Sequence, residues 1–129
     1  MKLSLKYKIA VAVASMTTIL VSYASAKDET VIMRGAISDS QCAYNVHSDS
    51  HSHEWMIKKG VYGANDDKSC TLKCVKEMGG RYVLVGPKEV YRLDDQTLPE
   101  KFAGDKVKVT GTLDPKTHTL HVQKIEEDK

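Results

Sequence analysis

The chain has 129 residues, 28% of them charged, and a formal net charge of +2. The first 26 positions contain three lysines and no acidic residue, so the remaining 103 residues carry 16 Lys and Arg against 17 Asp and Glu. A body so close to neutral gives no electrostatic reason to expect binding to nucleic acid or to an anionic membrane. Its length is that of one small domain, so we expect a single domain over residues 27–129.

The first 26 residues have the layout of a secretory signal peptide. Lys2, Lys6 and Lys8 form a positive start, residues 9–21 are apolar, and residues 24–26 are the small residues of a cleavage site. The apolar run of about 13 residues is shorter than the roughly 20 that a membrane-spanning helix needs. We expect cleavage at this site and a protein exported to the periplasm or the cell exterior without a stable membrane anchor. An uncleaved anchor is the alternative.

The rest of the chain is predicted to be mainly β. Alternating apolar residues and turn residues predict strands at 30–38, 81–86, 89–93, 106–113 and 117–126. In the last strand Leu120 and Val122 share a face, but Ile125 breaks the alternation. This change of phase predicts a β-bulge near Gln123-Lys124.

A polar, Cys/His-rich insertion at residues 39–79 separates the first two strands. Helices are predicted within it near 53–60 and at 71–78, the second with Ser69 as its N-cap. A short helix is predicted at 98–104, between strands three and four. This order of elements predicts a small five-stranded OB-like Greek-key barrel. Another small barrel or an open antiparallel sheet is the alternative.

Several short motifs are spread along the predicted domain. They are GAISDSQC at 35–42, His47, CTLKCV at 70–75, GRYVLV at 80–85, VYRL at 90–93 and AGDKVKVTGTL at 103–113. In these motifs the chain resembles a group of uncharacterised secreted bacterial proteins with an OB-like domain. The resemblance implies export and fold, and no established activity. The histidines at positions 51 and 53 are not part of the shared pattern.

The three cysteines of the chain all lie between positions 42 and 74. Cys70 and Cys74 are four residues apart, which places both sulfurs on one face of a helix. If the segment after the first strand folds over this helix, Cys42 and His47 can join them. Three thiolates and one imidazole form a closed tetrahedral zinc site, and sulfur donors also suit copper(I).

Three more side chains are candidate additional ligands. His51 and His53 lie two residues apart in a serine-rich run, and Met78 follows Cys74 by four residues. The alternatives are polar loop residues for the two histidines and core packing for Met78.

Oxidation competes with metal binding, because exported thiols tend to form disulfides. A bridge from Cys42 to Cys70 or to Cys74 would close a loop of roughly 30 residues and contribute about 3–4 kcal/mol on the chain-entropy model. The third cysteine would then be unpaired. A third interpretation is a thiol oxidoreductase, which would need a cysteine of low pKa.

A ligand surface without metal is the second possibility. The strands at 81–86 and 89–93 carry Arg81, Tyr82, Tyr91 and Arg92, side chains suited to stacking on ring-shaped ligands. The alternative is an ordinary half-exposed sheet. The sequence contains no nucleophile elbow or phosphate-binding loop, which favours binding over catalysis.

The sequence therefore predicts an exported protein that binds copper or zinc. The alternative is a disulfide-stapled OB-like module that binds a saccharide, a peptide or an unknown extracytoplasmic partner protein.

Overall fold

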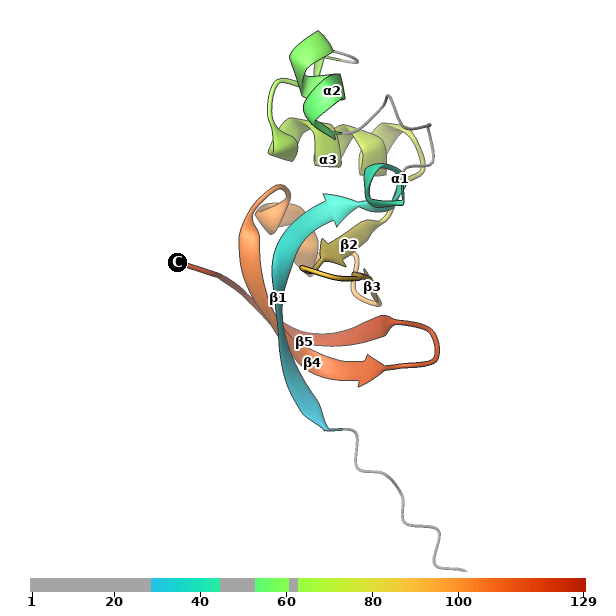
Figure 1. Ribbon diagram of the computed structural model, residues 1–129, viewed down its shortest axis with the longest axis vertical. Helices are drawn as coiled ribbons and strands as arrows, with labels where there is room; N and C mark the ends of the chain where they lie inside the picture. Colours follow the sequence, from blue (N-terminus) through green and yellow to red (C-terminus); the bar gives the residue numbers. More distant parts are fainter. Residues whose placement is uncertain (1–28, 45–52, 61–62) are drawn as a thin grey trace, which may run out of the picture.

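The computed structural model describes residues 29–44, 53–60 and 63–129, and Figure 1 shows their arrangement. The strands are β1 (Thr30–Asp39), β2 (Tyr82–Val85), β3 (Val90–Leu93), β4 (Lys106–Asp114) and β5 (Thr119–Glu127). The helices are α1 (Ser40–Ala43), α2 (His53–Lys59), α3 (Asp67–Glu77) and the short 3-10 helix η2 (Leu98–Phe102). The mainly β class is confirmed, and α1 is an element that was not predicted.

The five strands form one mixed sheet that closes in a ring, in the order β1-β2-β3-β5-β4. All neighbours are antiparallel except β3 and β5, which run parallel. β1 closes the ring because residues 30–36 pair with β4 and residues 36–39 pair with β2. At the crossover, a Cβ on Gly35 would lie 2.4 Å from the carbonyl oxygen of Val85. Only glycine permits this approach between the two backbones.

The predicted bulge is present in β5. Thr110 of β4 pairs with Lys124 and the next residue, Gly111, pairs with Val122, so the register skips Gln123. The extra residue restores the phase of the apolar side chains. Leu120 and Ile125 are consequently both buried, at 0% and 8% exposure.

The main core fills the interior of the ring. Its buried members are Ile37, Tyr82, Leu84, Leu93, Ala103, Val107, Val109, Leu120 and Ile125. The alternation predicted for residues 106–113 is confirmed, since Val107 and Val109 are fully buried while Lys106 is exposed. Leu72 and Val75 of α3 pack against this core from outside the sheet.

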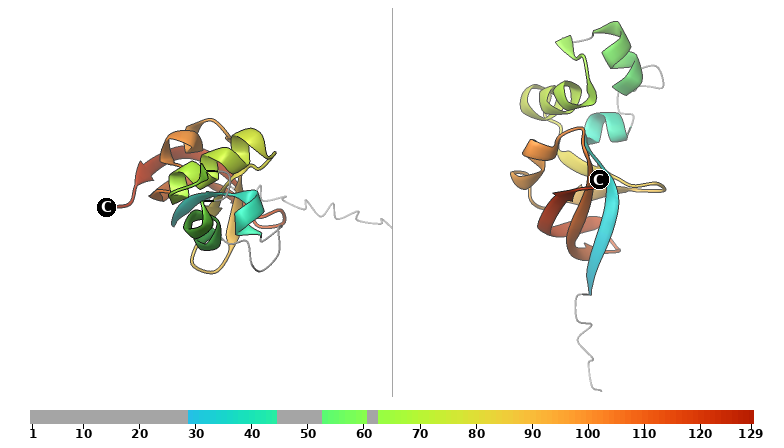
Figure 2. Two further views of the ribbon diagram at one scale, coloured as in Figure 1. Left: turned by 90° about the horizontal axis from the view of Figure 1, so that it is seen from above. Right: turned by 90° about the vertical axis from the view of Figure 1, so that its left-hand side faces the viewer.

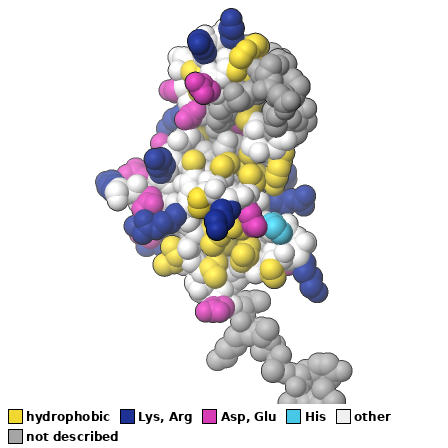
Figure 3. Space-filling view, in the orientation of Figure 1, with side chains coloured by type: hydrophobic (Ala, Val, Ile, Leu, Met, Phe, Trp, Pro, Cys, Tyr) yellow, Lys and Arg dark blue, Asp and Glu magenta, His cyan; other side chains and the backbone are white. Residues whose placement is uncertain are grey.

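The helices gather at one end of the ring. Figures 1 and 2 show α3 lying across that end, α1 directly after β1, and α2 beyond α3 on the side away from the sheet. On the face drawn in Figure 3, basic and acidic side chains are interspersed rather than gathered by sign. Helices α1, α2 and α3 together form a helical cap on the sheet.

Helix α3 begins earlier than the sequence predicted. Its N-cap is Asp66, whose carboxylate accepts a hydrogen bond of 2.6 Å from the Ser69 amide. Ser69 Oγ in turn accepts a bond of 3.1 Å from the Asp66 amide. The prediction of Ser69 as N-cap is wrong, because this residue is the third helical position of a capping box that Asp66 opens.

Thr71 of α3 offers a test of packing near the cysteines. It is fully buried, and its Oγ1 makes no hydrogen bond within the described part of the chain. A buried hydroxyl without a partner costs about 1–3 kcal/mol. We expect Thr71→Val to raise the free energy of unfolding by about 1 kcal/mol in urea titrations. Thr71→Ser, which keeps the hydroxyl and loses a methyl group, should lower it. A Val variant no more stable than the parent would show that Oγ1 has a partner.

Candidate metal centre

A second apolar cluster lies outside the ring, among the helices of the cap. Its buried members are Met56, Ala64, Cys70 and Cys74, and Cys42, Trp55, Ile57 and Met78 pack against them. Helix α3 thus has two buried faces. Leu72 and Val75 contact the core of the ring, while the two cysteines contact the cluster of the cap.

The structure brings the three cysteines together. The Sγ atoms of Cys42, Cys70 and Cys74 all lie within 4.8 Å of one another. All three are free thiols, so the predicted disulfide is not formed in this structure. Cys70 and Cys74 are each 1% exposed, and Cys42 is partly buried.

The spacing of the sulfurs fits a metal ion. A zinc–sulfur bond is about 2.3 Å, which places two sulfurs of a tetrahedral site roughly 3.8 Å apart. The upper limit of 4.8 Å for the sulfur separations is within about 1 Å of that geometry. Small side-chain rotations would bring the thiols into bonding distance of one ion.

Asp39 positions Cys42. This residue is the last of β1 and the N-cap of α1, and it is fully buried. Its Oδ1 accepts hydrogen bonds from the amides of Gln41, at 3.0 Å, and Cys42, at 2.9 Å. The carboxylate therefore turns the chain at the end of the strand and starts the short helix that carries Cys42.

Helix α1 is also tied to the segment that follows α3. The Ser40 amide donates to the Arg81 carbonyl oxygen at 2.8 Å, and the Arg81 amide donates to Ser40 Oγ at 3.0 Å. The Gln41 side-chain amide donates to the Met78 carbonyl oxygen. These bonds hold Cys42 at a set position relative to the helix that carries the other two cysteines.

The electrostatic surroundings keep the thiols protonated. Burial, with the nearby Asp39 carboxylate as the next contribution, raises the pKa of Cys74 to about 12. The same two causes raise the pKa of Cys42 and of Cys70. A nucleophilic thiol needs a lowered pKa. The raised pKa values of these thiols therefore do not favour the nucleophilic thiolate.

The other predicted ligands divide into two groups. His47 and His51 lie outside the described residues, and His53 is the first residue of α2 but its side chain is also outside them. Met78 packs against the cysteine cluster, together with the more deeply buried Met56. Among the described residues, the three cysteines are the set of His, Cys, Asp and Glu side chains close enough to share an ion.

Asp39 and Met56 were not singled out as site residues from the sequence. For Asp39 a signal existed, because aspartate is a preferred N-cap residue where a helix begins. Met56 lies in the predicted helix at 53–60, but no pattern distinguishes a methionine beside a thiol from one in an ordinary core.

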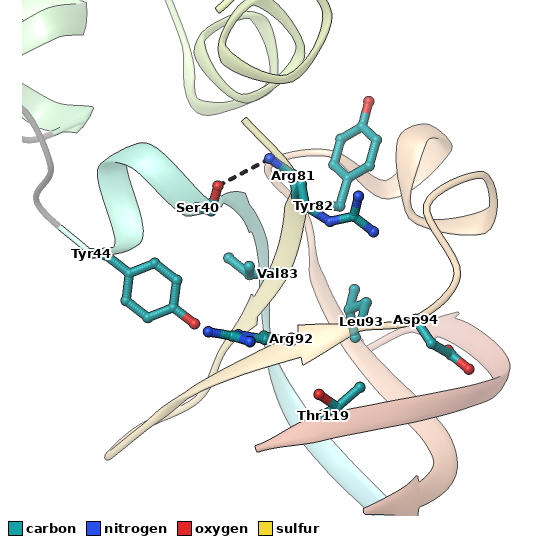
Figure 4. Close-up of a pocket in the computed structure, with 9 residues that line it drawn as sticks. All are labelled: Ser40, Tyr44, Arg81, Tyr82, Val83, Arg92, Leu93, Asp94 and Thr119. Carbon is teal, nitrogen blue, oxygen red and sulfur yellow. Dashed lines mark hydrogen bonds between the residues drawn. The ribbon is translucent and has the colours of Figure 1, made fainter. Parts of the chain in front are cut away.

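Three of the four residues predicted to form a ligand surface, Arg81, Tyr82 and Arg92, line one cavity. A cavity of about 430 Å³ opens on the outside of the ring (Figure 4). It is lined by Ser40, Tyr44, Arg81, Tyr82, Val83, Arg92, Leu93, Asp94 and Thr119. Tyr91, the fourth residue of the predicted ligand surface, packs against the core of the ring and is not among these lining residues. Its part in ligand binding stays a prediction.

The two arginines of the cavity do not form a single anion clamp. In Figure 4 the side chains of Arg81 and Arg92 extend in different directions from their strands. Tyr82 is only 2% exposed and belongs to the core of the ring. The lining of the cavity therefore combines two separate cationic side chains with the carboxylate of Asp94 and the apolar side chains of Val83 and Leu93.

Comparison with known proteins gives one match. Residues 74–128 match the family described as "Protein of unknown function (DUF5818)". The matched segment begins at Cys74 and includes β2 to β5, so β1, Cys42 and Cys70 lie outside it. No curated protein and no solved structure matches the chain.

Two observations bear on the membrane and on export. Within the described residues, no helix combines the length and the apolar character needed to cross a bilayer. The signal peptide predicted at residues 1–26 lies outside the described residues.

Proposed function

We propose that this is an exported protein that binds copper or zinc through Cys42, Cys70 and Cys74. The observation that carries the proposal is the meeting of three thiols, within 4.8 Å of one another, from two separate segments of the chain. A single buried cysteine is an ordinary small apolar residue. Three cysteines around one point, beside a buried carboxylate, are the donor set of a metal site.

The setting of the site supports this function. The Asp39 carboxylate accepts hydrogen bonds from two amides of α1, and α1 is hydrogen-bonded to Met78 and Arg81 after α3. The thiols are therefore assembled before a metal arrives. A bound metal would replace the thiol protons, since cysteine coordinates as thiolate. The surrounding apolar side chains would keep water away from the ion.

Fold and location are part of the same proposal. The strand order of the ring, with η2 between β3 and β4, supports an OB-like Greek-key domain over residues 27–129. Residues 39–79 form its insertion. The charged start, apolar stretch and small residues of positions 1–26 support export.

Metal loading tests the proposal. The protein is purified reduced and without oxygen, incubated with one equivalent of Zn(II) or Cu(I), and desalted. We expect one metal per chain by elemental analysis and protection of all three thiols from alkylation. Protein whose thiols are alkylated beforehand serves as the control and should retain no metal. Reduced protein that leaves the column without metal would contradict the proposal.

The cavity on β2 and β3 favours a second candidate function, a binding module without metal for an extracytoplasmic saccharide, peptide or partner protein. Exposed Arg81 and Arg92, together with the apolar side chains of Val83 and Leu93, suit a ring-bearing acidic ligand. We expect Arg92→Gln to weaken binding of a uronic-acid disaccharide in calorimetric titrations. Arg34→Gln is the matched control, because Arg34 is exposed on β1 and pairs with Asp128. Equal binding by both variants would show that Arg92 does not contact the disaccharide, and no binding by the parent would exclude this probe as the ligand.

A further inference from the structure

We infer that the ion held by the three cysteines is copper(I), bound by three sulfur atoms. This inference rests on the proposed function and names the ion for the same site. It follows from the donor atoms and from their surroundings.

The donor atoms are all sulfur. A closed zinc site takes four ligands in tetrahedral geometry, whereas thiolate and thioether donors favour copper(I). Among the described residues, the group of possible ligands consists of Cys42, Cys70 and Cys74, and the carboxylate of Asp39 is hydrogen-bonded to Cys74 beside them. Three sulfurs around one point suit copper(I), whereas a closed zinc site needs a fourth ligand in addition to these three.

The side chains around the thiols are apolar, and two of them are methionines. Met56 is 4% exposed, and Met78 packs against the same cluster. The cluster that contains the thiols therefore also contains two polarizable thioether sulfurs. Trp55, Ile57 and Ala64 complete an apolar wall. Water could serve as the fourth ligand of zinc, and this wall restricts its access to Cys70 and Cys74.

The carboxylate of Asp39 favours a divalent ion over copper(I). A buried negative charge attracts a divalent ion more strongly than a monovalent one. However, this carboxylate accepts hydrogen bonds from two amides of α1, which stabilise its charge without a metal. The sulfur donor set therefore outweighs the carboxylate in the choice of ion.

Copper X-ray absorption on the full chain, loaded anaerobically with one equivalent of Cu(I), tests the inference. We expect three sulfur scatterers and no nitrogen or oxygen in the first shell, and the same spectrum from His47→Gln. We also expect one equivalent of Cu(I) to displace bound Zn(II). A first shell containing nitrogen or oxygen, or zinc retained against equimolar Cu(I), would overturn the inference.

The same measurements separate this inference from the proposed function. If the cysteines bind Zn(II), or the spectroscopic probe Co(II), with a fourth ligand and retain it against Cu(I), the inference fails and the proposed metal site stands. If neither ion protects the thiols from alkylation, both fail. Met78→Leu keeps the side-chain volume and removes a thioether. It should leave three sulfur scatterers in place, and loss of one would overturn the assignment of all three to cysteine.

Discussion

Replacing Cys42, Cys70 or Cys74 by serine, one at a time, is expected to lower metal affinity at least about 100-fold. Loss of a mere outer-shell partner of a metal site costs roughly 10–100-fold, and loss of a direct ligand should cost more. The three sulfurs lie around one point, so each substitution opens the site equally. Competition with a chelator of known affinity measures the effect.

A neighbouring substitution controls for damage to the helix. Thr71 lies beside Cys70 on α3 and is equally buried, but it is not a ligand candidate. Thr71→Ser should therefore keep the affinity of the parent protein. A cysteine variant that binds as tightly as the parent would remove that cysteine from the site.

The reduced, metal-free protein should become less stable as the pH rises above about 9. The ordinary pKa of the cysteine thiol is 9.0, and burial raises that of Cys74 to about 12 in the folded protein. Below pH 9 both folded and unfolded thiols are protonated, and the stabilisation from the raised pKa is fully present. Above it the unfolded chain releases protons first, and stability falls until the pH passes the folded pKa, by up to about 1.4 kcal/mol per pH unit for each thiol.

Asp39→Asn isolates the contribution of the cluster to this pH dependence. Asparagine is an equally good N-cap residue but carries no charge, so the pKa of the thiols should fall and the alkaline loss of stability should shrink. Asp66→Asn makes the same change at the exposed cap of α3 and should not alter the loss. Urea unfolding at pH 7.5 and pH 10 under reducing conditions compares the three proteins. Equal losses in all three would mean that Asp39 does not act on the thiols.

Much of the sheet could be predicted because its signals are local. The alternation around Val107 and Val109 identifies β4, and the break at Ile125 identifies the skipped residue Gln123. A strand buries alternate side chains, so the order of apolar residues alone contains this information. The start of α3 was predicted wrongly because Asp66 and Ser69 are both residue types that favour the N-cap position, and Asp66 occupies it in the structure.

The candidate site could be predicted only in outline. The spacing of Cys70 and Cys74 shows that they share a helix face, and this needs no tertiary information. That Cys42 reaches them depends on α1, on the buried Asp39 cap and on the bonds to residues 78–81.

Local sequence patterns were sufficient to predict the mainly β class, most strand positions, the bulge and the grouping of three cysteines in one insertion. The closure of the sheet in a ring and the approach of the three sulfurs to within 4.8 Å of one another are evident only from the fold. The physical reason is the range of the interactions. Backbone geometry and alternating burial act between near neighbours in the chain, whereas ring closure and the thiol cluster depend on packing between segments that are distant in sequence.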